Sequence, residues 1–336
     1  MIKRRDSKFE VIRIISMMFI VMYHYTLYGN WSKNIMNSFK IQFFRPWGQV
    51  GVGLFVMITS YFISSKASSL KLSFLRNKKL WIKTVFYSWI ILILTFIFNP
   101  NYLSLKQVVF AIFPVIFDEY WFITSYIVLI FLLPFIDSVI QKCSKKEFEI
   151  YIGIIIIVTD VMPYIQNTDP NAPLGGIFSV GAMLAPYLIA AYIKKYNFRL
   201  NNIKAIVIIT IGVLLEYLSV FIMSKHNDPG RFTGGILPLI VAVGIFLLFI
   251  NMRSFHSKAI NWVASGVLAT YLITEHPIFR LVFWHQLLNV ARFQNPTWMF
   301  ILMGIVIAFG TVTICSIIDH LFQWGYKMIT VKLHKK

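Results

Sequence analysis

EVIRIISMMFIVMYH, residues 10–24, is an almost wholly apolar stretch that contains three ionisable side chains, Glu10, Arg13 and His24. On an α-helix eleven residues make about three turns, so Arg13 and His24 share nearly the same face, with a rise of roughly 16 Å between them. Glu10 precedes Arg13 by one turn and can pair with it. Ionisable groups inside an apolar helix are costly to bury and usually mark a pathway or a site.

The rest of the chain has the composition of a membrane protein. Hydrophobic residues make up 58% of the 336 residues and charged residues only 13%, and the mean hydropathy is +0.70. Apolar runs recur from end to end, which predicts an all-α fold: a polytopic membrane helical bundle that forms a single domain over residues 1–336. We expect ten transmembrane helices, at about 9–28, 48–64, 81–98, 120–138, 148–163, 177–193, 203–223, 234–250, 262–283 and 297–318.

The net charge of +19 lies mostly between the predicted helices. In a soluble chain such a charge would suggest nucleic acid. Here Lys and Arg are concentrated in alternate loops, starting with the N-terminal segment, as the excess of positive charge in cytoplasmic loops requires. We therefore expect both termini in the cytoplasm and no binding of nucleic acid. Residues 99–119 are too long for a turn and partly apolar, so we expect them to lie in or dip into the membrane interface.

His24 is a candidate general base or transient acyl carrier, because neutral imidazole works near physiological pH. The alternative is a structural histidine that is hydrogen-bonded to a neighbouring helix. Arg13 can hold a phosphate group near the inner face, with Glu10 orienting it. The spacing agrees equally well with a simple ion pair between Arg13 and Glu10, or with an Arg13 side chain that extends to the cytoplasmic lipid headgroups.

Other charged residues form weaker patterns. The run FLRNKKLWIK (74–83) ends the second loop, enters the third predicted helix and can bind an anionic ligand, although charge bias in inner loops explains most of it. Its basic residues are Arg76, Lys78, Lys79 and Lys83. Glu119 with Trp121, and Glu275, lie toward the outer mouth, where interface anchors are also common. Glu216 is a lone carboxylate in an apolar helix. No cysteine or histidine spacing predicts a metal site.

In order along the chain, these residues resemble the acyltransferase type 3 family of bacterial membrane O-acyltransferases that modify surface glycans. The resemblance is carried by Arg13 and His24, with ten residues between them, then by GQVGVGLFVMITSYFI (48–63), by the basic run and by YWFITSYIVLIFLLPFI (120–136). GVLATYLITEHPIF (266–279) continues it, so that it covers nearly the whole chain.

The resemblance implies an enzyme of the bacterial cell membrane that transfers an acyl group, usually acetyl, from cytoplasmic acyl-CoA to a hydroxyl of a surface polysaccharide or its lipid-linked precursor. Acetyl-CoA is then a donor substrate, and no permanently bound cofactor is expected. Arg13, with the basic run, would hold the CoA phosphates, and Glu10 would orient Arg13. His24 would act on the acceptor hydroxyl, and Glu119, Trp121 and Glu275 would lie on the acceptor side.

Three departures from the family pattern stand out. Lysines occupy most of the basic run, where the family usually has arginines, and Thr59-Ser60-Tyr61 replaces Ser-Gly-Tyr at the end of the second predicted helix. Thr274 stands where the family commonly has a histidine. Two other functions stay open: a transporter or flippase with Arg13, His24 and Glu216 along a permeation path, and a non-catalytic scaffold. The acceptor glycan and the oligomeric state cannot be read from the sequence.

Overall fold

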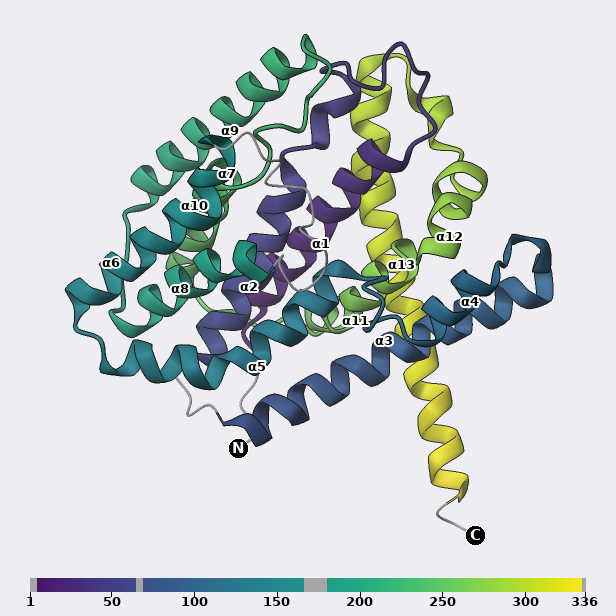
Figure 1. The fold of residues 1–336 in the computed structure, drawn as a ribbon, viewed down its shortest axis with the longest axis horizontal. Helices are drawn as coiled ribbons and strands as arrows, with labels where there is room; N and C mark the ends of the chain where they lie inside the picture. Colours follow the sequence, from purple (N-terminus) through teal and green to yellow (C-terminus); the bar gives the residue numbers. More distant parts are fainter. Residues whose placement is uncertain (1–4, 65–68, 166–179, 334–336) are drawn as a thin grey trace.

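The structure, a computed structural model, describes residues 5–64, 69–165 and 180–333, and these residues are almost entirely helical, with no strand among them (Figure 1). Six of the helices described are long and apolar enough to cross a membrane. The all-α membrane class is thus confirmed, and the count of ten spans stays a prediction. The main helices are α1 (Ser7–Tyr28), α2 (Trp47–Ile63), α3 (Leu70–Phe98), α4 (Leu105–Ile112), α5 (Trp121–Lys142), α6 (Lys145–Ile156), α8 (Gly181–Lys195), α9 (Asn202–Ser224), α10 (Ile236–Asn251), α11 (Lys258–Thr274) and α13 (Thr297–Leu333).

Helix α1 lies in the middle of the bundle and packs against α2, α11 and α13. Small residues bring α2 especially close, as in many membrane helix pairs. A Cβ atom on Gly51 of α2 would lie 2.6 Å from the carbonyl oxygen of Ser16 on α1. This close contact gives the glycine-rich second segment a structural reason. It also fixes the orientation of α1, which carries Arg13 and His24.

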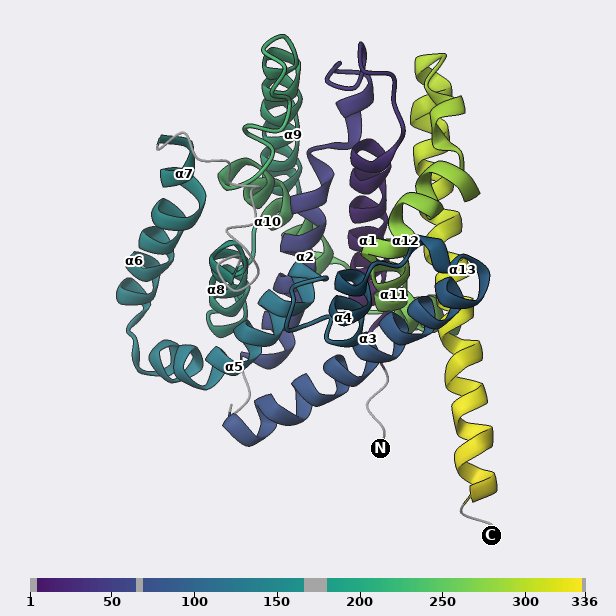
Figure 2. The same cartoon turned by 45° about the vertical axis from the view of Figure 1, so that its right-hand side comes forward.

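Both ends of the described chain lie at the same end of the bundle. Helix α1 begins there and α13 ends there, extending beyond the neighbouring helices (Figures 1 and 2). We call this the terminal end, and the other the opposite end. The arrangement agrees with an even number of crossings, as the sequence predicts, and the assignment of the terminal end to the cytoplasm stays a prediction.

Two predicted spans need correction. The expected span 262–283 is broken, because α11 ends at Thr274 and the short α12 (Pro277–Leu281) starts afresh. Pro277 lacks the N–H that would continue α11, and it disfavours helical geometry at the residue before it. The expected loop before the span 81–98 is also wrong in part: α3 begins at Leu70, so the basic run is helical.

The remaining boundaries agree more closely. One exception is α13, which continues well past the predicted end at 318. The predicted start of a span at 177 lies outside the described residues. The other expected spans correspond to helices within a few residues, except that 148–163 is made of α6, a π-helical turn (Ile157–Val161) and the short α7 (Met162–Ile165).

The segment between α4 and α5 enters the core. Tyr120, at its end, is 1% exposed and donates a hydrogen bond of 2.8 Å to the carbonyl oxygen of Leu272 in α11. Helix α5 therefore starts inside the bundle, and α3 crosses α13 obliquely (Figures 1 and 2). This inward path brings the first residues of α5 into the core, and the expected position of residues 99–119 at the membrane interface stays a prediction.

Candidate active site

A cavity of about 470 Å³ lies between α1, α2, α3, α5 and α11. Three arginines line it: Arg5 just before α1, Arg13 on α1 and Arg76 on α3. Most of the remaining lining is apolar or aromatic, with Phe122 and Tyr126 contributed by the first turns of α5. Its size is in the usual range for small-molecule sites. A mixed lining of this kind suits a ligand with an anionic part and an apolar part.

The arginines are suited to an anion. Arg13 is ion-paired with Glu10, one turn earlier on α1. Arg76 has a buried Nη1 atom with no hydrogen-bond partner in the described part of the chain. A buried N–H donor without a partner is costly, and a guanidinium matches the oxygens of a phosphate in a two-bond geometry. An anionic ligand in this cavity would satisfy that donor.

The three lysines of the basic run are placed differently from Arg76. Lys78 and Lys79 are exposed and do not line the cavity. Lys83 instead lies 2.8 Å from the carboxylate of Asp319 on α13. Tyr87 also donates a 2.7 Å hydrogen bond to Asp319, so Lys83 belongs to a contact between α3 and α13. Of the predicted donor-binding residues, the structure brings together Arg13 and Arg76.

His24 meets a carboxylate away from the cavity. Its Nδ1 atom lies 2.8 Å from Oε1 of Glu275, the residue that follows α11, and the two side chains are 7% and 8% exposed. Neither of these atoms has a hydrogen-bond partner among the described residues, so the contact between them is a close electrostatic one. A carboxylate beside Nδ1 favours the proton on that nitrogen and leaves Nε2 with its lone pair. The arrangement can orient an imidazole and stabilise its charged form, as carboxylates do in hydrolase triads.

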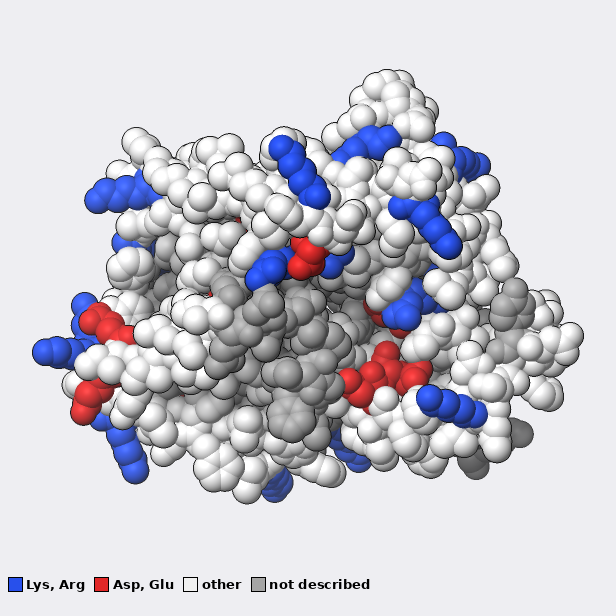
Figure 3. Space-filling model, turned by 45° about the horizontal axis from the view of Figure 1, so that its top comes forward, with Lys and Arg blue, Asp and Glu red and all other residues white. Residues whose placement is uncertain are grey.

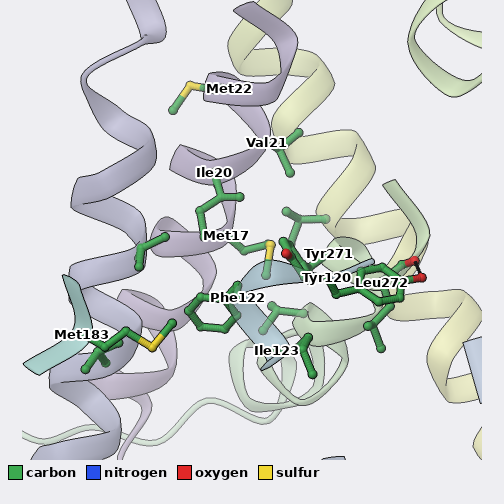
Figure 4. Close-up of a cluster of buried hydrophobic side chains, with 14 of the residues drawn as sticks. Met17, Ile20, Val21, Met22, Tyr120, Phe122, Ile123, Met183, Tyr271 and Leu272 are labelled. Carbon is green, nitrogen blue, oxygen red and sulfur yellow. Dashed lines mark hydrogen bonds between the residues drawn. The ribbon is translucent and has the colours of Figure 1, made fainter. Parts of the chain in front are cut away.

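An apolar layer separates this pair from the cavity. Met17, Phe122 and Tyr271 are all buried in one hydrophobic cluster, part of which is drawn in Figure 4. On α1, Met17 follows Arg13 by one turn and precedes His24 by two. On α11, Tyr271 lies between Leu268, which lines the cavity, and Glu275. Phe122 closes the gap, with its ring centroid 5.8 Å from that of Tyr271.

The structure places the three predicted acceptor-side residues in different surroundings. Glu275 faces His24 directly. Glu119 lies in the segment before α5, where burial raises its pKa and the nearby Arg280 and Lys106 oppose that shift. Trp121 packs against the hydrophobic core through its neighbour Phe122, at 6.0 Å between ring centroids. Figure 3 shows the opposite end of the bundle turned toward the viewer, with acidic groups gathered in a few places among basic ones.

Three residues near the site escaped the sequence analysis as candidates. Arg5 lines the cavity, and Tyr28 lies one turn after His24 with its ring centroid 5.4 Å from that of the imidazole. Arg280 lies 3.9 Å from Glu275. The signal for Tyr28 was its helical spacing from His24, and the signal for Arg280 was a charge directly after an apolar helix. Glu216, by contrast, is buried on α9 with no hydrogen-bond partner for its carboxylate among the described residues.

Comparison with known proteins gives one match. A protein-family model described as "Acyltransferase domain" matches residues 6–320, which include every candidate residue except Arg5. No curated protein and no solved structure matches the chain.

Proposed function

This chain belongs to the acyltransferase type 3 family, a family of multi-pass membrane proteins, and from that premise we propose the substrates and residues of its acyl transfer. The donor is a cytoplasmic acyl-CoA, in the simplest case acetyl-CoA. The acceptor is a hydroxyl of a surface polysaccharide or of its lipid-linked precursor, reached from the opposite end of the bundle. The enzyme is placed in the bacterial cell membrane, with its terminal end in the cytoplasm.

The arginine-lined cavity supports the donor assignment. CoA combines anionic phosphates with a long, mostly apolar pantetheine arm, and the cavity combines Arg5, Arg13 and Arg76 with an apolar lining. The arginines would hold phosphates, and Glu10 would keep Arg13 turned toward them. The helical rise of roughly 16 Å from Arg13 to His24 is a distance that an extended pantetheine arm can span.

The His24–Glu275 contact is the single observation that carries the reaction. As the acceptor oxygen bonds to the thioester carbonyl carbon, Nε2 of His24 takes the hydroxyl proton, the C–S bond breaks, and the proton passes to the departing CoA thiolate. Glu275 holds the ring and stabilises the imidazolium. If His24 carries the acyl group between donor and acceptor, the same nitrogen is the nucleophile. Both routes need the apolar layer to part for the thioester.

A transporter or flippase is the alternative function. The unpartnered carboxylate of Glu216 is the observation that favours it, because buried ionisable groups often mark a permeation path. Glu216 lies on α9, which has no residue in the lining of the cavity. A transporter would show no dependence on acyl-CoA and would change the amount of glycan, not its ester content.

The test compares alkali-releasable acetate per sugar on surface glycan from cells that lack the protein. The cells are complemented with wild type or with His24→Ala, after equal amounts of both proteins are shown in the membrane. We expect wild type to restore the ester and His24→Ala to leave it absent. A change in glycan amount at constant acetate per sugar would support transport. Full acetylation with His24→Ala would mean that another residue performs the chemistry.

A further inference from the structure

Arg280 approaches the carboxylate oxygen of Glu275 that His24 does not contact. One carboxylate oxygen, Oε1, is 2.8 Å from Nδ1 of His24, and the other, Oε2, is 3.9 Å from Nη1 of Arg280. The carboxylate is therefore placed between a titratable base and a permanent cation. Its own side chain is 8% exposed. A buried carboxylate needs an opposite charge or hydrogen-bond donors around it.

Tyr28 holds the guanidinium in place. Nη1 of Arg280 donates a 3.2 Å hydrogen bond to the Tyr28 hydroxyl, and the guanidinium carbon lies 4.3 Å from the centre of the same ring. His285 contacts the backbone oxygen of Tyr28 at 2.9 Å. Because Tyr28 is one turn beyond His24 on α1, Arg280 is fixed to the helix that carries the proposed base. The Arg280 side chain is 32% exposed, so its head is not a freely solvated charge.

The turn that carries Glu275 and Arg280 is itself anchored. His276 is completely buried, and its Nδ1 atom accepts a 3.2 Å hydrogen bond from the backbone N–H of Ile278 at the start of α12. On its other side, Nε2 of His276 lies 3.2 Å from the hydroxyl of Ser88 on α3. The backbone N–H of Arg280 donates to the carbonyl oxygen of His276 at 2.8 Å. This turn therefore sets the spacing between Glu275 and Arg280 by backbone geometry.

We propose that Arg280 is a positioning residue for acyl transfer: it keeps the Glu275 carboxylate turned toward Nδ1 of His24. The inference rests on the proposed function. During the reaction the acceptor proton goes to Nε2 of His24 and then to the CoA thiolate, while Glu275 stays a carboxylate throughout. Arg280 touches neither substrate in this scheme and acts only through Glu275.

Removing the cation has a predictable effect on the geometry. The charged and titratable groups near Glu275 are His24, Tyr28, Tyr120, Tyr271 and Arg280, with Glu119 next to Arg280. Without Arg280 the Oε2 atom of Glu275 loses its cation, so the carboxylate can turn away from Nδ1 of His24. We therefore expect kcat to fall, and a lysine at position 280, which keeps the positive charge, to restore part of it.

The experiment uses the full chain, purified into nanodiscs with its surface glycan as acceptor. The kcat and KM values of acetyl transfer are measured for wild type, Arg280→Gln, Arg280→Lys and the control Arg292→Gln, which alters an exposed arginine near the same end of the chain. For Arg280→Gln we expect kcat at least about tenfold lower and an unchanged KM for acetyl-CoA. Arg280→Lys should restore part of kcat, and Arg292→Gln should match wild type.

Other outcomes overturn the inference. A normal kcat for Arg280→Gln, with a raised KM for the glycan alone, would make Arg280 an acceptor-binding residue. If Arg280→Gln does not fold, Arg280→Lys decides in the same way: a wild-type kcat with a raised glycan KM refutes positioning. Failure of the wild-type protein itself to transfer acetyl from acetyl-CoA would refute the proposed function, and the two failures are thereby distinguished.

Discussion

His24 of α1 and Glu275 at the end of α11 come from opposite ends of the chain, yet their side chains lie 2.8 Å apart in a nearly closed environment. An apolar layer separates them from the cavity that Arg13, Arg76 and Arg5 line. The fold thus keeps the groups suited to hold an anionic donor apart from the groups suited to move a proton. The predictions for Glu275, Arg76 and Phe122 test this division, and those for Lys83 and Glu119 test other contacts of the fold.

Glu275→Gln keeps the shape of the side chain and removes its charge. We expect kcat for acetyl transfer to fall by about 10²- to 10⁴-fold, because the imidazolium loses its counter-charge and the ring its orientation. The KM for acetyl-CoA should not change, since Glu275 lies outside the cavity. Initial rates in nanodiscs measure both constants, with Asp228→Asn in an exposed loop as the control. A raised KM with normal kcat would contradict this role.

Arg76→Ala should raise the KM for acetyl-CoA by about 10- to 100-fold and leave kcat at saturation largely intact. The reason is the loss of a charge-assisted hydrogen bond to phosphate, which is worth about 1.5–3 kcal/mol. Competition by free CoA measures the same affinity without chemistry. Lys78→Ala, an exposed neighbour on α3, is the matched control and should behave as wild type. Equal effects of the two substitutions would favour a diffuse charge over a built phosphate site.

Lys83→Ala should lower stability and spare donor binding. The substitution leaves Asp319, whose side chain is 3% exposed, without its cation, and removing one partner of a buried pair typically costs about 3–5 kcal/mol. Thermal unfolding in detergent should therefore begin at a lower temperature, with an unchanged KM for acetyl-CoA. Lys79→Ala, exposed on the same helix, should alter neither quantity. If Lys83→Ala, but not Lys79→Ala, raised the KM for acetyl-CoA, Lys83 would belong to the donor-binding site.

Phe122→Ala should weaken the apolar layer between the cavity and His24. We expect more CoA released by hydrolysis for each acetyl group transferred, because water gains access to the thioester. Release of CoA thiol and acetate on glycan are measured in the same reaction. The control is Phe98→Ala, because the Phe98 side chain at the end of α3 is 80% exposed. An unchanged ratio of release to transfer would show that Phe122 does not close the path.

Glu119 should make stability depend on pH. Because burial raises its pKa above the usual 4.5, the folded protein binds this proton more tightly than the unfolded chain does. Stability should therefore fall as the pH rises from about 4.5 through the raised pKa, as linkage requires. Glu119→Gln should remove that part of the decline, measured by thermal unfolding over a pH series. The same slope in both proteins would assign the decline to other groups.

The fold could be predicted wherever a long apolar run coincides with one helix. Helices α1 and α9 are examples, and their ends fall within a few residues of the expected ones. The start of α3 was missed because Lys and Arg suggested a loop, although both residues are good helix formers. The break after α11 was signalled by Pro277, but the apolar residues on both sides of it favoured a continuous span.

The residues of the site and the local Glu10–Arg13 pair were predicted, and the contacts between distant helices were not. Arg13 and His24 were singled out because ionisable groups are costly in an apolar helix, and Arg76 because it belongs to a basic run that can bind an anion. Which of them meet depends on how distant helices pack. Glu275 reaches His24, and Asp319 reaches Lys83, only because α11 and α13 lie beside helices from the beginning of the chain. No local pattern encodes such contacts, so the lysines and Arg76 looked equivalent.

The layer of Met17, Phe122 and Tyr271 has a consequence for the energy balance of the cell. A membrane that stores a proton gradient tolerates no open aqueous path, yet the proposed reaction needs a passage between its two sides. In the proposed reaction, we expect this layer of three side chains to part by rotamer changes around a group as small as acetyl and then to close again. A long fatty acyl chain would keep the layer apart. We therefore expect the layer to limit transfer to short acyl groups.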